Sequence, residues 1–213
     1  MKGIFVSFLF CIITVASCES KKENKTPVTR DSLATDTTAM TNEMPVNSAY
    51  SGVDISPMDM CYYPADYPKL KMTKSITSPP LARVIYSRPH LQRRQLFQGI
   101  LQYGQPWRMG ANEATELQLF RPARIQDKTI AAGRYSLYCI PQSDKWTIVI
   151  NSNIDTWGLQ QDSAMDVARF DTPVNQLPWR LEYFSMVFEK TATGAELLIA
   201  WDNIETRLPF RFE

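Results

Sequence analysis

Two carboxylates in the middle and second half of the chain are the first candidates for chemistry. Glu113 stands in the stretch YGQPWRMGANEAT, residues 103–115, and Asp166 follows much later. Two carboxylates flanking one bond can act as general acid and base in its hydrolysis. If one strand carries Glu113 and Glu116, they point to opposite faces and do not form such a pair. Glu113 with Asp166, brought together across the fold, is the catalytic arrangement that the sequence leaves open.

The same stretch also predicts a binding site. In that interpretation Arg108, Asn112 and Glu113 lie at the mouth of a pocket, and Trp107 and Trp157 are flat platforms for a sugar or another ring. The structural alternative is a tight turn between two glycines that leads into a strand. In that case the stretch is a corner of the fold, where an Arg108–Glu113 ion pair and the Asn112 side chain provide hydrogen-bond partners for backbone groups that lack a neighbouring strand. The residue types fit both interpretations.

Charge is nearly balanced over the whole chain, with a formal net charge of +1. No overall field attracts nucleic acid, and we expect no nucleic-acid partner. Basic residues are concentrated before residue 134, where a patch that receives an anionic ligand is one interpretation. The other is that the two halves of the chain interleave in the sheets and their charges cancel. The arginines of the patch would be Arg83, Arg88, Arg93, Arg94 and Arg108.

The chain contains a single histidine, His90. One histidine excludes metal centres built from several histidines, and a lone histidine beside a proline is typical of a packing or surface residue. Arg88 and His90 are nevertheless kept as candidates for ligand binding. The sequence has no Gly-x-Ser-x-Gly turn and no Gly-rich phosphate loop. It therefore implies no metal and no cofactor.

The first seventeen residues are typical of a signal peptide. Lys2 precedes the apolar run IFVSFLFCIITV, which is too short to span a bilayer. The following Ala16, Ser17 and Cys18 resemble the lipobox of bacterial lipoproteins, in which the cysteine becomes a lipidated N-terminus. We therefore expect export and a lipid on Cys18 that anchors the chain in the bacterial cell envelope, facing the periplasm or the cell surface. An ordinary secreted protein cleaved nearby is the alternative.

Residues 18–49 are predicted to form the lipidated cysteine and a disordered tether. After Cys18 the sequence is rich in Ser, Thr, Lys, Asn and Asp and contains no aromatic residue until Tyr50, so it cannot bury a core. A flexible segment of this length spans about 30 Å. The triplets DSL at 31–33 and DTT at 36–38 resemble bacterial O-glycosylation acceptors.

Residues 50–213 are predicted to form one all-β domain. Apolar residues alternate with polar ones at Trp146, Ile148 and Ile150, and again at 184–188 and 208–212. Short strands separated by turn residues favour an antiparallel β-sandwich or a jelly roll. Only LQQDSAMDVAR predicts a helical turn. The expected strands cover 82–87, 114–120, 123–126, 134–140, 146–151, 182–190, 195–202 and 206–212.

Two cysteines remain once Cys11 is lost with the signal peptide and Cys18 carries lipid: Cys61 and Cys139. An oxidising compartment permits a disulfide between them. A buried free thiol at Cys139 is equally compatible with its apolar strand.

Several spaced motifs resemble one family. VIYSRPHLQRRQLFQGILQYGQPWRMGANEATEL, AGRYSLYCIP, WTIVIN and AELLIAWDN are similar to bacterial exported proteins catalogued as domain of unknown function 2911, over about 56–212. The resemblance implies a β-rich domain, often on secreted or lipid-anchored chains, without an established activity. It supplies no catalytic residues.

Two functions of different classes follow from these patterns. The favoured one is a non-catalytic, membrane-anchored lipoprotein that binds a glycan, a peptide or a partner protein. The alternative is a hydrolase of envelope or extracellular polymers, with Glu113 and Asp166 as acid and base.

Overall fold

The computed structural model describes residues 56–212. The signal peptide, Cys18, the tether and the two candidate glycosylation triplets lie outside the described residues. What the sequence indicates for them stays a prediction.

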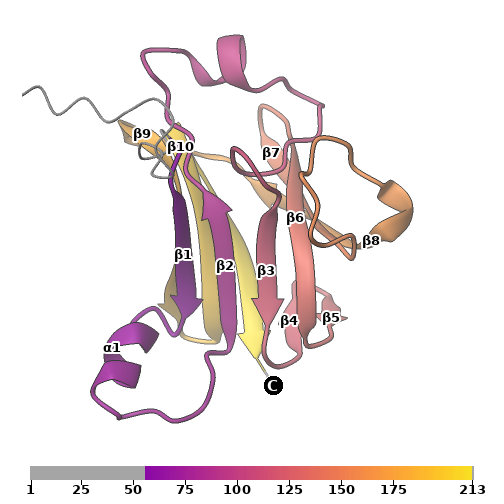
Figure 1. Ribbon diagram of the computed structural model, residues 1–213. Coiled ribbons are helices and arrows are strands. Elements are labelled where there is room, and N and C mark those ends of the chain that lie inside the picture. Colours follow the sequence, from indigo (N-terminus) through magenta and orange to yellow (C-terminus); the bar gives the residue numbers. More distant parts are fainter. Residues whose placement is uncertain (1–55, 213) are drawn as a thin grey trace, which may run out of the picture. The chain divides into compact units, whose positions relative to one another are not determined.

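Within residues 56–212, the strands form two antiparallel sheets that pack face to face (Figure 1). One sheet has the order β1-β2-β3-β6-β7-β8 and the other β5-β4-β10-β9. This confirms the all-β antiparallel sandwich. The strands are β1 (Met58–Tyr63), β2 (Ala82–Ser87), β3 (Thr115–Leu119), β4 (Ala123–Ile125), β5 (Lys128–Ile130), β6 (Gly133–Pro141), β7 (Lys145–Asn151), β8 (Asp166–Pro173), β9 (Asn175–Thr191) and β10 (Gly194–Phe212).

The helices are short and lie outside the sheets. The α-helix α1 (Tyr67–Met72) lies at one end of the sandwich, and η1 (Leu96–Ile100), one turn of π-helix, lies in the loop that crosses the other end (Figure 1). The 3₁₀-helix η2 (Ser163–Met165) confirms the helical turn expected in LQQDSAMDVAR. No helix among the described residues is long and apolar enough to cross a membrane.

Aromatic side chains fill the space between the sheets. Trp146, Phe184 and Trp201 are at most 1 % exposed. Trp107, from the loop between β2 and β3, stacks on Trp201 with ring centroids 5.5 Å apart and meets Phe184 edge-on at 4.8 Å. Burying side chains of this size contributes about 1.5–3 kcal/mol each. Trp107 therefore fastens its long loop to the core.

The alternating pattern predicted most strands, but β1, β5 and β8 were missed. In β8, Ala168, Phe170 and Thr172 are buried while their neighbours are exposed. Alanine and threonine carry a weak hydrophobic signal, so the alternation was obscured. Thr172 is buried because its hydroxyl donates to the Trp146 carbonyl at 3.0 Å.

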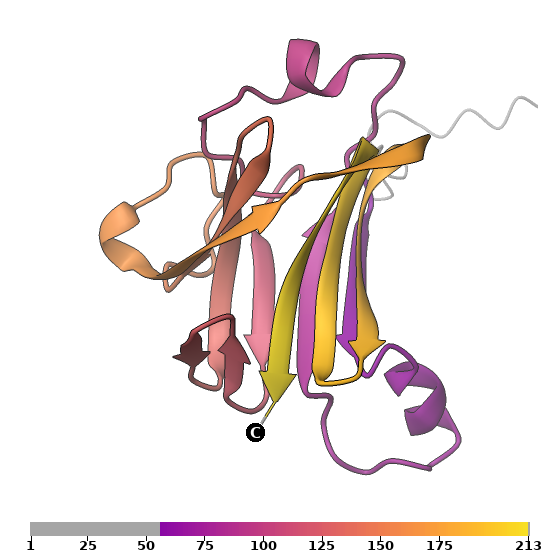
Figure 2. The same ribbon diagram turned by 180° about the vertical axis from the view of Figure 1, so that it is seen from behind.

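The long strand β10 doubles back on itself. A straight strand of its length would span about 60 Å, yet a Cβ on Gly194 would lie 2.1 Å from the Phe210 carbonyl oxygen. The reversal occurs at Asp202, whose φ of 55° is left-handed (Figure 2). The two predicted strands 195–202 and 206–212 are therefore the two arms of β10.

Cys61 and Cys139 are both free thiols. They lie on β1 and β6, which are three strand spacings apart in one sheet, so the two residues are separated by at least about 14 Å, whereas a disulfide needs Cα atoms within about 7 Å. The structure thus decides the open question against the bridge. Burial raises the pKa of the Cys61 thiol to about 12, and it raises that of Cys139 well above its ordinary value, so both stay protonated at neutral pH.

Candidate functional site

A pocket of about 370 Å³ lies on the outer face of the six-stranded sheet. Its floor is a row of side chains from adjacent strands: Ile85 on β2 pairs with Glu116 on β3, which pairs with Ser136 on β6. All three line the pocket because paired residues of neighbouring strands share one face. The antiparallel register therefore builds the floor.

The wall of this pocket is the segment after β7, which carries Trp157. The Trp157 side chain is 55 % exposed and lines the pocket. The segment is held in place because the Ala114 amide donates to the Thr156 carbonyl at 3.2 Å. Gly158 follows with a left-handed φ of 69°, and an added Cβ would lie 2.9 Å from the Cβ of Ala114. Only glycine fits this close approach, so the packing of Gly158 against Ala114 helps to position Trp157.

Three carboxylates give the pocket a negative character. Glu113, Glu116 and Asp155 line it. Arg134 lies 2.5 Å from Glu116 and 2.7 Å from Asp155, which ties the floor to the wall. The hydrogen bonds that the Arg134 guanidinium donates to these two carboxylates raise its pKa. Glu113 is exposed and takes part in none of the ion pairs of residues 56–212, which leaves its carboxylate available to a ligand.

The side chains of Glu113 and Glu116 do not point to opposite faces, as they would if one strand carried both residues. β3 begins at Thr115, so Glu113 precedes the strand and escapes its alternation. Both side chains therefore line the same pocket. The turn before β3, rather than the spacing of the two residues, decides where Glu113 lies.

The stretch 103–115 forms a corner of the fold and contributes residues to three pockets. Trp107 exchanges backbone hydrogen bonds of 2.8 Å with Cys139 and packs into the core, so it is mainly structural. Arg108 does not form the anticipated bidentate pair with Glu113: its Nη1 donates to the Trp157 carbonyl at 3.4 Å. Asn112 has a left-handed φ of 39° and belongs to the turn. Trp107 and Arg108 line a second pocket, whereas Trp157 and Glu113 line the first.

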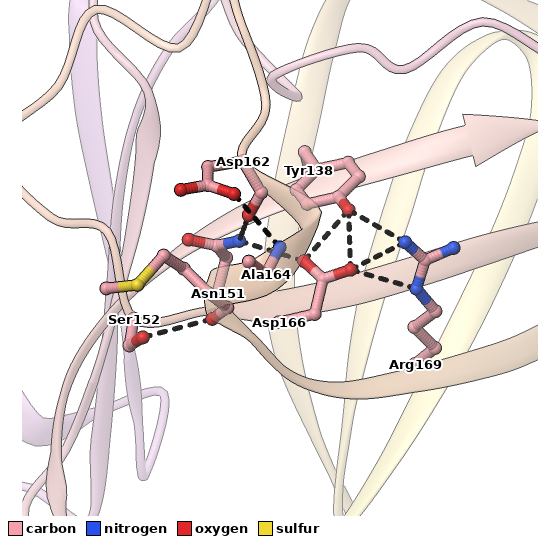
Figure 3. A network of polar contacts seen from close by, with 8 residues as sticks. Tyr138, Asn151, Ser152, Asp162, Ala164, Asp166 and Arg169 are labelled. Atoms are coloured by element: carbon pink, nitrogen blue, oxygen red, sulfur yellow. Dashed lines mark hydrogen bonds and ion pairs between the residues drawn. The ribbon is translucent and has the colours of Figure 1, made fainter.

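Asp166 lies in a polar network that is distinct from the pocket of Glu113 (Figure 3). Its side chain is 10 % exposed and accepts hydrogen bonds from the Tyr138 hydroxyl at 2.9 Å, Asn151 Nδ2 at 2.8 Å and Arg169 Nη2 at 2.6 Å. Burial is the main reason why the pKa of Tyr138 rises to about 12, and the hydrogen bond to Asp166 adds to it. The Asp166 oxygens are thus engaged within this network, and Asp166 does not line the pocket of Glu113.

Arg88 and His90 lie near the β9 strand. Arg88 is paired with Asp59 at 3.1 Å and donates to the Phe184 carbonyl at 3.2 Å. His90 stacks on Tyr183 with ring centroids 5.1 Å apart. Both side chains tie the β2–β3 loop to the sheet, and neither lines the Trp157 pocket.

The predicted basic patch is dispersed. Arg83 donates to Gln118 at 2.5 Å, and Arg88 is neutralised by Asp59. Arg94 and Arg108 line a common pocket.

The sequence did not point to Ser136, Asp155 or Arg134 as site residues. They meet only through strand register and the folding of a loop onto the sheet. A cross-strand alignment of Glu116 with Ser136 would have been the usable signal.

No group of three or more His, Cys, Asp or Glu side chains in the described part of the chain is placed to hold a metal ion. No curated protein and no solved structure matches the chain. Residues 68–210 match the family described as "Protein of unknown function (DUF2911)". The matched range includes Trp157, Arg94 and Arg108. The chain belongs to this family.

Proposed function

We propose that the protein is an exported, lipid-anchored module that binds a glycan in the Trp157 pocket. The observation that carries the glycan proposal is the half-exposed Trp157 ring beside the Glu113, Glu116 and Asp155 carboxylates. A sugar ring has an apolar face that packs on an aromatic side chain, and its hydroxyls donate to carboxylates. The cavity volume of about 370 Å³ lies within the range of small-ligand sites.

Replacing Trp157 with alanine is expected to weaken glycan binding by about tenfold to a hundredfold, because an aromatic anchor contributes on the order of 1.4–2.8 kcal/mol. A panel of neutral oligosaccharides is screened first, and the affinity of the best one is measured by calorimetry. Trp179→Ala is the matched control, since Trp179 is 60 % exposed and does not line the pocket. Failure of every oligosaccharide to bind, or equal losses in both variants, would sink the proposal.

The same panel distinguishes binding from hydrolysis. A binding module leaves the oligosaccharides intact, and Glu113→Gln then changes only the affinity. Release of shorter products that Glu113→Gln abolishes would instead establish the hydrolase, with Glu113 as its acid or base.

Lipid anchoring rests on the sequence around Cys18. In a Gram-negative host, the Cys18→Ala chain is expected to leave the membrane fraction and to incorporate no labelled palmitate, because it lacks the acceptor thiol. Cys61→Ala is the control, since its thiol is predicted to take no lipid. A Cys18→Ala chain that still sediments with membranes and carries label contradicts the anchor.

A further inference from the structure

The second pocket, of about 410 Å³, has the opposite charge to the Trp157 pocket. Arg94 and Arg108 line it, and no carboxylate does among residues 56–212. The rest of the lining is mostly apolar and includes Pro89, Ile100 and Trp107. We call it the Arg94–Arg108 pocket.

Neither guanidinium group forms an ion pair with a carboxylate of residues 56–212. Arg94 donates through Nε to the Leu91 carbonyl at 2.9 Å and through Nη2 to the His90 carbonyl at 3.0 Å. Arg108 donates to the Trp157 carbonyl at 3.4 Å. Carbonyl oxygens fix the orientation of a guanidinium, but they do not neutralise it.

Five arginines of the described chain each lie within 3.1 Å of a carboxylate oxygen, whereas Arg94 and Arg108 share the lack of such a partner with the remaining arginines and differ from those in lining one pocket. The five are Arg88, Arg134, Arg169, Arg180 and Arg207.

The environment of Arg108 penalises an unpaired cation. Partial burial lowers the pKa of its guanidinium, while the charge of Glu113 acts in the opposite direction. An anion in the pocket would relieve this desolvation penalty.

The floor is suited to an apolar body. Trp107 stacks on the fully buried Trp201, and both line the pocket. Gly110 and Gly158 also line it, so backbone rather than side chain forms part of the wall. A ligand can thus place an apolar group against the half-buried Trp107 while its charged end faces the arginines.

We infer that the Arg94–Arg108 pocket binds an organic carboxylate, whose charged end pairs with Arg94 and Arg108 and whose apolar body packs on Trp107. Guanidinium groups bind carboxylates through paired hydrogen bonds, which favours this anion. The site is separate from the Trp157 pocket, whose three carboxylates would repel an anion.

Benzoate is the probe, and the neutral benzamide is its isostere. Titration of the purified full chain, followed by tryptophan fluorescence and calorimetry, is expected to show saturable benzoate binding with a Kd on the order of 1 mM. Benzamide is expected to bind at least about tenfold more weakly, because it lacks the charge that the arginines recognise. N-acetylphenylalanine and glucuronate, tested at the same concentrations, distinguish a peptide-type carboxylate from a sugar acid.

Three substitutions locate the binding. Arg108→Gln and Arg94→Gln are each expected to weaken benzoate binding by about tenfold or more, whereas Arg93→Gln leaves it unchanged. Arg93 is the matched control because it is an exposed arginine next to Arg94 that does not line the pocket. Arg94 is also exposed, so Arg94→Gln keeps the test valid even if Arg108→Gln does not fold.

Equal affinity for benzoate and benzamide overturns the inference. An equal loss in Arg93→Gln overturns it as well, and so does the absence of saturable benzoate binding. Glycan binding in the Trp157 pocket is measured with other probes, so either proposal can fail while the other stands.

Discussion

Gly194→Ala is expected to lower the free energy of unfolding by about 4 kcal/mol, a larger loss than most point substitutions cause. The added Cβ would lie 2.1 Å from the carbonyl oxygen of Phe210. The oxygen belongs to the backbone and the Cβ is bonded directly to it, so no side-chain rotation can relieve the overlap. Neither can turn aside, so the two arms of β10 must separate. Tyr63, whose hydroxyl donates to the Gly194 carbonyl at 2.8 Å, would lose its partner as well. Thermal unfolding should show a midpoint lower by roughly 8–16 °C.

Gly104→Ala separates steric overlap from backbone strain. Gly104 also has a left-handed φ, of 75°, but an added Cβ meets no atom within 4 Å. Strain alone costs about 1–2 kcal/mol. If Gly194→Ala lowers the midpoint no more than Gly104→Ala does, the arms of β10 do not pass as closely as the structure has them.

Asp166→Ala is expected to lower the free energy of unfolding by about 3 kcal/mol. The substitution leaves the buried Tyr138 hydroxyl and the Asn151 amide without their carboxylate partner, and it frees the charge of Arg169. Because the Arg169 side chain is 47 % exposed, water solvates its charge once the carboxylate is removed. The loss of stability is therefore smaller than for a fully buried ion pair. The midpoint of thermal unfolding should fall by roughly 6–12 °C.

Asp171→Ala is the matched control for Asp166→Ala. Asp171 lies on the same strand and pairs with Lys145 at 2.6 Å, but its side chain is 53 % exposed. An exposed pair of this kind contributes up to about 1 kcal/mol. Equal losses in the two variants would show that the Tyr138–Asp166–Arg169 network is no more stabilising than a surface pair, and Asp166 would return as a candidate for catalysis.

Most strands of the sandwich were predictable because local alternation reports which side chains are buried. β2 and β7 follow this rule: Val84 in β2 and Ile148 in β7 are buried, and the residue before each of them is partly exposed. β1 and β8 escaped it because their buried positions hold small, polar or half-buried side chains. The reversal at Asp202 was indicated only by the gap between two predicted strands.

The candidate site was predictable in part. Trp157 and Glu113 were recognised from their residue types, and they do line one pocket. Trp107 and Arg108 were assigned to the same site, yet they border the second pocket. The Arg108–Glu113 pair was wrong because the Arg108 guanidinium donates to the Trp157 carbonyl, a partner far away in the sequence.

The sequence by itself determined the all-β class, most strands and the residue types that a site could use. It also carries the prediction of export and a lipid on Cys18, which depends on contiguous residues. Only the tertiary structure decided which polar residues meet, that Cys61 and Cys139 stay apart, and that Asp166 bonds to Tyr138, Asn151 and Arg169. The physical reason is range: alternation and signal motifs are local, whereas pockets, ion pairs and disulfides depend on strand register and loop packing between distant segments.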